Sequence, residues 1–208
     1  PVSCPELPLQ PQKDFRTEFQ IFAKAKVLAV VGRIRPVKGQ RIVLHSLNKL
    51  LLEFADLVLL IPYRDTSEYE AEMQALRSDI SKLELEAHVR LIPEREDILA
   101  LMEFADAGIV SSIDSEVICR VAVEFFSVGT PVVAFPTGCL PEIIRHADNG
   151  LLTKDQTQEA LSDELRKILT DPELCERLGQ GARRDAEIRF NPQNMLTETL
   201  EVFERSLN

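Results

Sequence analysis

The segment SSIDSEVICRVAVEFFSVGTPVVAF, residues 111–135, contains a polar stretch, an apolar helical pattern, a Gly-Thr-Pro turn and an apolar run. We predict a helix over Ser115–Val128 and a buried strand over Pro131–Phe135. The run Val132-Val133-Ala134-Phe135 shows no alternation of apolar and polar residues, which is typical of parallel strands covered on both faces. A helix leading into such a strand is the repeating unit of α/β folds.

Further strands and helices are predicted along the rest of the chain. Five more apolar runs are strand candidates: Val27–Val31, Leu57–Ile61, Val89–Ile92, Gly108–Ser111 and Gly150–Leu152. Helical patterns lie around Phe15–Ala25, at Lys38–Phe54, Ser67–Leu85, Glu96–Ala105, Leu140–His146 and Thr157–Leu169, and after the cap-and-proline pairs Asp171-Pro172 and Asn191-Pro192. This alternation predicts an α/β fold with a doubly wound, Rossmann-like parallel sheet of about six strands and C-terminal helices.

Length and composition indicate one soluble domain. Of the 208 residues we assign 26–208 to the domain and 1–25 to a proline-rich lead-in with a short helix. Because the chain starts at Pro1, we interpret it as a piece of a longer protein. The net charge of −10 argues against nucleic-acid and anionic-membrane surfaces. The cysteines, Cys4, Cys119, Cys139 and Cys175, lack C-x-x-C spacing, so we expect free thiols in a cytoplasmic protein.

Two basic residues follow the first predicted strand, in the loop Gly32–Gly39. Doubly wound sheets bind ligands beyond the carboxyl ends of their strands, so Arg33 and Lys38 would face a ligand. A guanidinium and an ammonium there could grip a diphosphate. The alternative is an ordinary solvated basic loop. No metal-ligand spacing is present among the three histidines, so we expect no metal site.

Glu116 and Glu124 lie eight positions apart, at the start and middle of one predicted helix. They would then lie on nearly the same side, where they could contact the hydroxyls of a ligand whose charged part sits among the helix's free N–H groups. With Arg120 between them they could instead form an exposed ion-pair ladder of little energetic weight.

Read in order, several segments are similar to those of a known family. The sequence resembles the C-terminal half of retaining glycosyltransferases of the GT-B fold, group 1 or family 4, from about Val27 to Asn191. The matching segments are VGRIRPVKG (31–39), ADAGIVSS (105–112), the two glutamates, GTPVVA (129–134), LPEII (140–144), NGLL (149–152) and RFN (189–191).

The resemblance implies a role for each candidate residue. This half of such enzymes binds a nucleoside-diphosphate sugar (UDP-, GDP- or ADP-linked), which is transferred to a glycan or lipid-linked acceptor, as in polysaccharide or lipopolysaccharide biosynthesis, without metal or cofactor. Arg33 and Lys38 would hold the diphosphate, Glu116 the transferred sugar and Glu124 the ribose. Further donor contacts would come from Gly32, from backbone at Ile92 and Pro93, and from Ile118, Cys119, Arg120 and Val121 at the helix start.

One departure and one absence qualify what the resemblance implies. The family has Glu-Gly-x-Gly where this chain has Glu116-Val117-Ile118-Cys119, which could mean a different sugar or a wider pocket. The acceptor-binding N-terminal half, with any membrane-docking surface, is missing, so we expect this chain to bind donor weakly and to transfer nothing alone. The alternative is a non-catalytic α/β module derived from such a half.

Overall fold

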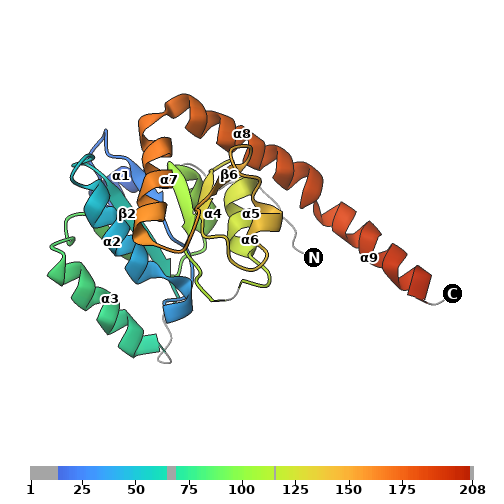
Figure 1. Ribbon diagram of the computed structural model, residues 1–208, viewed down its shortest axis with the longest axis horizontal. Coiled ribbons are helices and arrows are strands. Elements are labelled where there is room, and N and C mark those ends of the chain that lie inside the picture. The colour runs from blue at the N-terminus through green and yellow to red at the C-terminus, as the bar shows by residue number, and fades with distance from the viewer. Residues whose placement is uncertain (1–13, 65–68, 115, 207–208) are drawn as a thin grey trace.

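The computed structural model describes residues 14–64, 69–114 and 116–206, and it contains a six-stranded parallel sheet (Figure 1). The strands are β1 (Val27–Ala29), β2 (Val58–Tyr63), β3 (Val89–Pro93), β4 (Ala107–Val110), β5 (Val132–Ala134) and β6 (Gly150–Leu152). Their order is β3-β2-β1-β4-β5-β6, and every neighbouring pair is parallel. The predicted doubly wound sheet is therefore confirmed.

The strands contribute to two hydrophobic clusters, one on each face of the sheet. In β1 the side chains of Val27 and Ala29 belong to one cluster and that of Leu28 to the other, as the two-residue period of a strand requires. All three are at most 1% exposed. Apolar residues on both faces explain why the strands read as continuous apolar runs.

Three helices cover the face of the sheet that carries Leu28: α2 (Gln40–Leu50), α3 (Glu70–Lys82) and α7 (Gln158–Thr170). Their leucines and isoleucines pack against Leu28 of β1 and Ile109 of β4. The predicted start of the α3 pattern, Ser67, lies outside the described residues.

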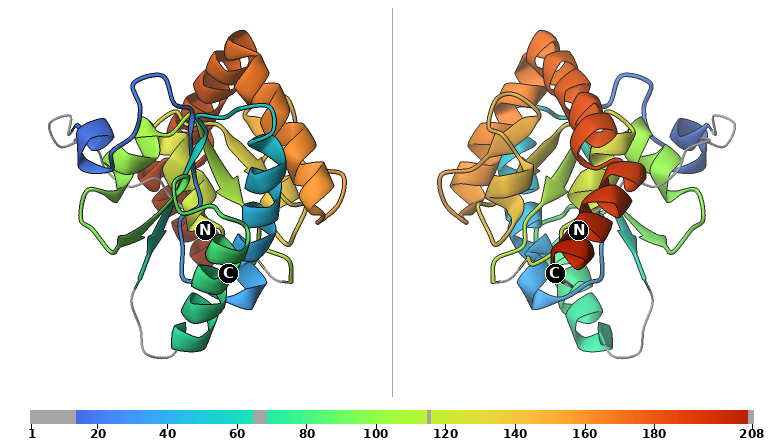
Figure 2. Two further views of the ribbon diagram at one scale, coloured as in Figure 1. Left: turned by 90° about the vertical axis from the view of Figure 1, so that its left-hand side faces the viewer. Right: turned by 90° about the vertical axis from the view of Figure 1, so that its right-hand side faces the viewer.

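The opposite face is covered by α1 (Phe15–Glu18), α4 (Ile98–Phe104), α5 (Arg120–Ser127), α6 (Leu140–Ile143) and part of α8 (Pro172–Arg189). Figure 2 shows α2 in front of the sheet from one side and α9 (Pro192–Ser206) in front from the other. In Figure 1, α9 extends away from the body of the molecule.

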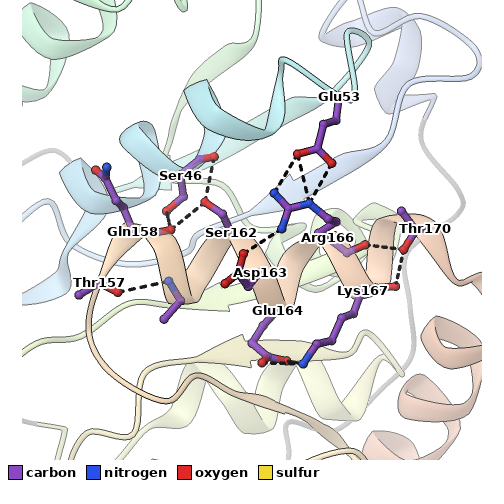
Figure 3. A network of polar contacts seen from close by, with 11 residues as sticks. Ser46, Glu53, Thr157, Gln158, Ser162, Asp163, Glu164, Arg166, Lys167 and Thr170 are labelled. Carbon is purple, nitrogen blue, oxygen red and sulfur yellow. Dashed lines mark hydrogen bonds and ion pairs between the residues drawn. The ribbon is translucent and has the colours of Figure 1, made fainter.

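Two buried serines allow α2 and α7 to pack closely (Figure 3). Ser46 and Ser162 are 0% exposed. The Ser46 hydroxyl donates to the Gln158 carbonyl at 3.0 Å, and the Ser162 hydroxyl donates to the same carbonyl at 2.7 Å. At the other end of the contact, Arg166 of α7 pairs with Glu53 at 2.8 Å. These contacts hold α7 against α2.

Several helices are shorter than predicted. The predicted helix over 38–54 is split, because Gly39 adopts φ 66° after the 3-10 turn η1 (Pro36–Lys38), and α2 begins only at Gln40. The helix predicted around 15–25 ends at Glu18, and Gln20 has φ 53°. The cap predicted at Asp171 is confirmed, because its carboxylate accepts from the Leu174 N–H at 2.9 Å.

Within the described ranges, no helix is both long enough and apolar enough to cross a lipid bilayer.

We expect Phe125→Ala to lower the free energy of unfolding by about 3–5 kcal/mol, because its ring is fully buried between α5 and the sheet. The matched control is Phe203→Ala on α9, where the ring is 63% exposed and the change should stay within about 0.5 kcal/mol. Urea denaturation measures both variants. Equal losses of unfolding free energy in the two variants would contradict the placement of the core.

Candidate ligand-binding site

A cavity of about 510 Å³ opens beyond the carboxyl ends of β1 and β4. These strands are neighbours in the sheet, but the chain goes from β1 to β2 on one side and from β4 to β5 on the other. The cavity therefore lies at the point where strand order reverses, as expected for this fold. It is lined by residues 30–33, 109–112 and 118–121, together with Lys38, Gln40, Arg64, Glu116 and Glu124.

The prediction that Glu116 begins a helix is wrong. Helix α5 starts at Arg120, so Glu116 lies in the loop before it and Glu124 in the helix. The backbone of Glu116 makes a tertiary contact instead, since its carbonyl accepts from the Cys139 N–H at 2.8 Å. The β-branched residues Val117 and Ile118 also have lower helix propensity than straight-chain residues. The two carboxylates thus reach one cavity from different elements.

Two glycines allow the loops around the cavity to approach closely. Gly39 has φ 66°, and a Cβ atom there would lie 2.2 Å from the Ser111 carbonyl oxygen. Gly138 has φ 54°, and a Cβ atom would lie 2.2 Å from the Glu116 carbonyl oxygen. Both positions need the left-handed conformation and the missing side chain. The loops after β1, β4 and β5 are therefore held together through their backbones.

An ion pair between Lys38 and Glu116 forms part of the cavity wall. Lys38 Nζ is 2.6 Å from Glu116 Oε2, and the hydroxyl of Ser112 donates to the same oxygen at 2.5 Å. Glu116 is 6% exposed. A buried carboxylate requires such partners, because losing them leaves an uncompensated charge. Among residues 14–64, 69–114 and 116–206, no donor contacts the second oxygen, Oε1.

Three arginines add positive charge to the cavity of this acidic chain. Arg33 is exposed, and its guanidinium has no hydrogen-bond or ion-pair partner within the described part of the chain. Arg64 is 3.3 Å from Glu94 in an exposed, weak pair. Arg120 is also exposed, and it is 3.4 Å from the partly buried Glu124. Arg33 is thus the cation most available to an anionic ligand.

Glu124 is half-buried on the inner side of α5. Burial raises the pKa of its carboxyl above the ordinary value, and the nearby Arg120 partly opposes this shift. The predicted ladder is present only in its second half, because Arg120 pairs with Glu124 while Glu116 pairs with Lys38.

The side chains that stand in place of the family's glycines, at positions 117 and 119, leave the cavity open. Val117 is 80% exposed, and the cavity lining does not include it. Cys119 is 2% exposed with φ −90°, a conformation open to any residue. Burial raises the pKa of the Cys119 thiol to about 12, so it stays protonated at neutral pH. Neither Val117 nor Cys119 has the left-handed backbone conformation, so neither position requires glycine.

The predicted site residues Gly32, Arg33, Lys38, Glu116, Ile118, Cys119, Arg120, Val121 and Glu124 all line this cavity. At the helix start, the N–H of Arg120 donates to the Ile118 carbonyl at 3.2 Å. This N–H is therefore not free for a ligand, although free N–H groups are predicted at the helix start. Ile92 and Pro93 line a separate depression at the β3 edge of the sheet, with Phe19, Arg90 and Arg95. The structure does not bring them to the cavity.

Sequence reasoning missed Ser112, Gln40 and Arg64 as cavity residues. Ser112 follows β4, in a loop predicted to face the ligand, but serines there are too common to single out. Arg64 follows β2, which lies directly beside β1. Knowledge of the strand order would have pointed to it.

No cluster of three or more metal-ligating side chains occurs among the described residues. Cys119, Cys139 and Cys175 are free thiols, and Cys4 lies outside the described ranges.

The raised pKa of Glu124 predicts a pH-dependent stability. The folded protein holds the Glu124 proton to higher pH than the unfolded chain, whose ordinary pKa is about 4.5. Between those two pKa values the folded state binds more protons, so its free energy of unfolding falls as pH rises. Glu124→Gln removes the titrating carboxyl, and with it this fall in the free energy of unfolding.

We therefore expect the stability of Glu124→Gln relative to wild type to increase as pH is raised from about 4 through the folded pKa, and then to level off. Urea denaturation across this range measures it. Arg120→Ala is the companion variant, and it should steepen the pH dependence because it removes the cation that opposes the shift. A difference that does not vary with pH would refute the burial of this carboxyl.

Comparison with known proteins gives the family. Residues 11–185 match the family described as glycosyl transferases group 1. The D-inositol 3-phosphate glycosyltransferase of Jonesia denitrificans is 30% identical over 195 residues, which are 92% of this chain and 46% of the relative. Spore coat protein SA of Bacillus subtilis is 27% identical over 201 residues, 94% of this chain and 52% of the relative. The chain thus spans about half the length of these relatives.

Solved structures show the same fold. Anabaena HepE in complex with UDP and glucose superposes with a TM-score of 0.84 at 25% identity, covering 91% of this chain and 50% of that one. The C-terminal domain of LpcC, a group 1 family protein of Francisella tularensis, gives a TM-score of 0.77 at 20% identity, covering 89% of this chain and 95% of that domain. The chain belongs to the glycosyl transferases group 1 family, and it has the fold of one Rossmann-like half of a GT-B glycosyltransferase.

Proposed function

We propose that the cavity binds a nucleoside-diphosphate sugar and that the chain is the donor-binding half of a retaining, metal-independent glycosyltransferase. The observation that carries the proposal is the pairing of Lys38 with Glu116 at 2.6 Å, in a cavity that is also lined by Arg33, whose guanidinium has no partner among the described residues. A diphosphate needs cations, and a sugar needs a hydrogen-bond acceptor. This cavity offers both within a few ångströms.

Arg33 and Lys38 would hold the diphosphate. Arg33 can donate as a planar fork to two phosphate oxygens, and Lys38 can add a compact charge. Departure of the nucleoside diphosphate places negative charge on its β-phosphate oxygens. A fixed donor at such an atom contributes roughly 10²–10³ in rate. The two cations therefore supply the stabilisation that leaving requires.

Glu116 and Glu124 would bind the hydroxyl groups of the donor. Oε1 of Glu116, which has no donor among the described residues, can accept from a hydroxyl of the transferred sugar, while Lys38 and Ser112 hold Oε2. A carboxylate with two strong donors is a weak nucleophile, which suits binding better than attack on carbon. Glu124 can accept from the ribose once its weak pair with Arg120 opens. HepE, a neighbour of the same fold, binds UDP and glucose.

Retention of configuration places the incoming acceptor on the face from which the diphosphate departs. This route depends on leaving-group stabilisation and on acceptor placement. We assign acceptor placement to a second half of the enzyme, because the chain spans about half of its relatives. That half would bind a glycan or lipid-linked acceptor and make any membrane contact. The free thiols support a reducing, cytoplasmic setting.

The open cavity favours donor binding over a non-catalytic module. Loss of the family's glycines could have closed the sugar site, yet the side chain of Val117 is exposed and the cavity keeps about 510 Å³. That volume is within the range of small-molecule sites.

We expect Arg33→Ala to weaken nucleoside-diphosphate binding by about 10- to 100-fold, the loss of one charge-assisted contact. Isothermal calorimetry with UDP, GDP and ADP measures it and identifies the base. The matched control is Arg35→Ala, in the same loop, whose guanidinium lies over the Tyr69 ring and does not line the cavity. Its effect should be under about twofold. Equal losses in both variants would contradict a specific diphosphate site.

The chain alone should bind the donor without transferring its sugar, and binding should not depend on divalent metal. Calorimetry in EDTA and in Mg²⁺ should give the same affinity, because Arg33 and Lys38 supply the charge. Sugar transfer by the 208-residue chain, measured by nucleotide release, would show that acceptor placement does not need a second half. An affinity that appears only with Mg²⁺ would contradict the metal-independent mechanism.

A further inference from the structure

We propose that Ser112 is a positioning residue that orients the Glu116 carboxylate toward the transferred sugar. This inference rests on the proposed function. The hydroxyl of Ser112 donates to Glu116 Oε2 at 2.5 Å and lies 3.4 Å from Lys38 Nζ. It therefore contacts both charged groups of the cavity.

The hydroxyl of Ser112 has a fixed direction. Because its proton points to Glu116, its lone pairs face the ammonium of Lys38. Both donors converge on Oε2, which leaves Oε1 as the one Glu116 oxygen without a donor among the described residues. The bonds from Ser112 and Lys38 together orient the carboxylate so that its other oxygen is offered to the ligand.

Ser112 is itself held in place by a chain of hydrogen bonds. It is 1% exposed, and its carbonyl accepts from the Thr137 hydroxyl at 2.7 Å. Thr137 is 4% exposed, and its hydroxyl accepts from the Gln156 amide at 2.8 Å. This chain of bonds runs from the loop after β6 to the cavity wall. A serine so constrained can orient its neighbour without moving.

The contribution of Ser112 grows when the diphosphate binds. The phosphate oxygens compete with Glu116 for the ammonium of Lys38. As Lys38 turns toward them, the buried carboxylate loses its ion-pair partner, and Ser112 becomes its remaining donor within the described part of the chain. Without that donor, the carboxylate would turn toward whatever cation or water is nearest. Ser112 should therefore affect sugar binding more than diphosphate binding.

The test compares a nucleotide with its sugar derivative. Calorimetry gives the ratio of Kd for UDP to Kd for UDP-glucose, with GDP and ADP and their glucose derivatives in parallel. We expect Ser112→Ala to lower this ratio about 10- to 100-fold, the loss of one hydrogen bond to a charged group, and to raise Kd for the bare diphosphate by a smaller factor. Ser112→Thr, which keeps the hydroxyl, should retain the wild-type ratio.

Two further variants separate positioning from general stability. Ser162→Ala removes another fully buried serine hydroxyl, between α7 and α2 and away from the cavity (Figure 3), so it should lower thermal stability without changing the ratio. In the background of Glu116→Gln, Ser112→Ala should give a smaller fall, because the charged acceptor is gone and only an amide oxygen can accept from Ser112.

The outcomes distinguish the two proposals. If wild type binds UDP, GDP or ADP but the ratio is unchanged in folded Ser112→Ala, or falls as much in Ser162→Ala, the role of Ser112 is overturned while the donor site stands. An undiminished effect of Ser112→Ala in Glu116→Gln also overturns it. If wild type binds none of the three nucleotides, the proposed function fails, and the role of Ser112 fails with it.

Discussion

The cavity exists because β1 lies beside β4. The two strands pair in parallel through Leu28 with Ala107 and Ala29 with Gly108, although nearly 80 residues separate them in the sequence. Parallel pairing brings both carboxyl ends to one edge of the sheet. Lys38 and Glu116, which follow those ends, can meet only because of this pairing. Any change that shifted its register would separate the cation from the carboxylate.

The cavity gathers positive charge in an otherwise acidic chain. With a formal net charge of −10, the protein as a whole repels diphosphates, so attraction must be local. In the cavity, the four cations Arg33, Lys38, Arg64 and Arg120 face the two carboxylates Glu116 and Glu124. Glu116 holds Lys38 in place, and Arg33 has no partner within the described part of the chain.

The strands could be predicted from sequence because parallel strands buried on both faces are continuous apolar runs, as in Leu57–Ile61. The grouping of Arg33, Lys38 and Glu116 followed from the sheet topology and from similarity to the family. The start of α5 could not be predicted, because the hydrogen bond from the Cys139 N–H that holds Glu116 outside the helix is a tertiary contact. Ser112 was missed for the same reason, since its hydroxyl acquires a partner only in the folded chain.

The close backbone contacts at Gly39 and Gly138 have a consequence for how this cavity can diversify. Main-chain atoms fix the paths of the loops after β1, β4 and β5, so side chains that project from these loops into the cavity can change without moving its frame. Cys119 illustrates this freedom, since it lines the cavity at a position where the family has a glycine and does not force a left-handed backbone. A scaffold of this kind can acquire a preference for a new ligand through one or two substitutions, while the loops that frame the cavity keep their shape.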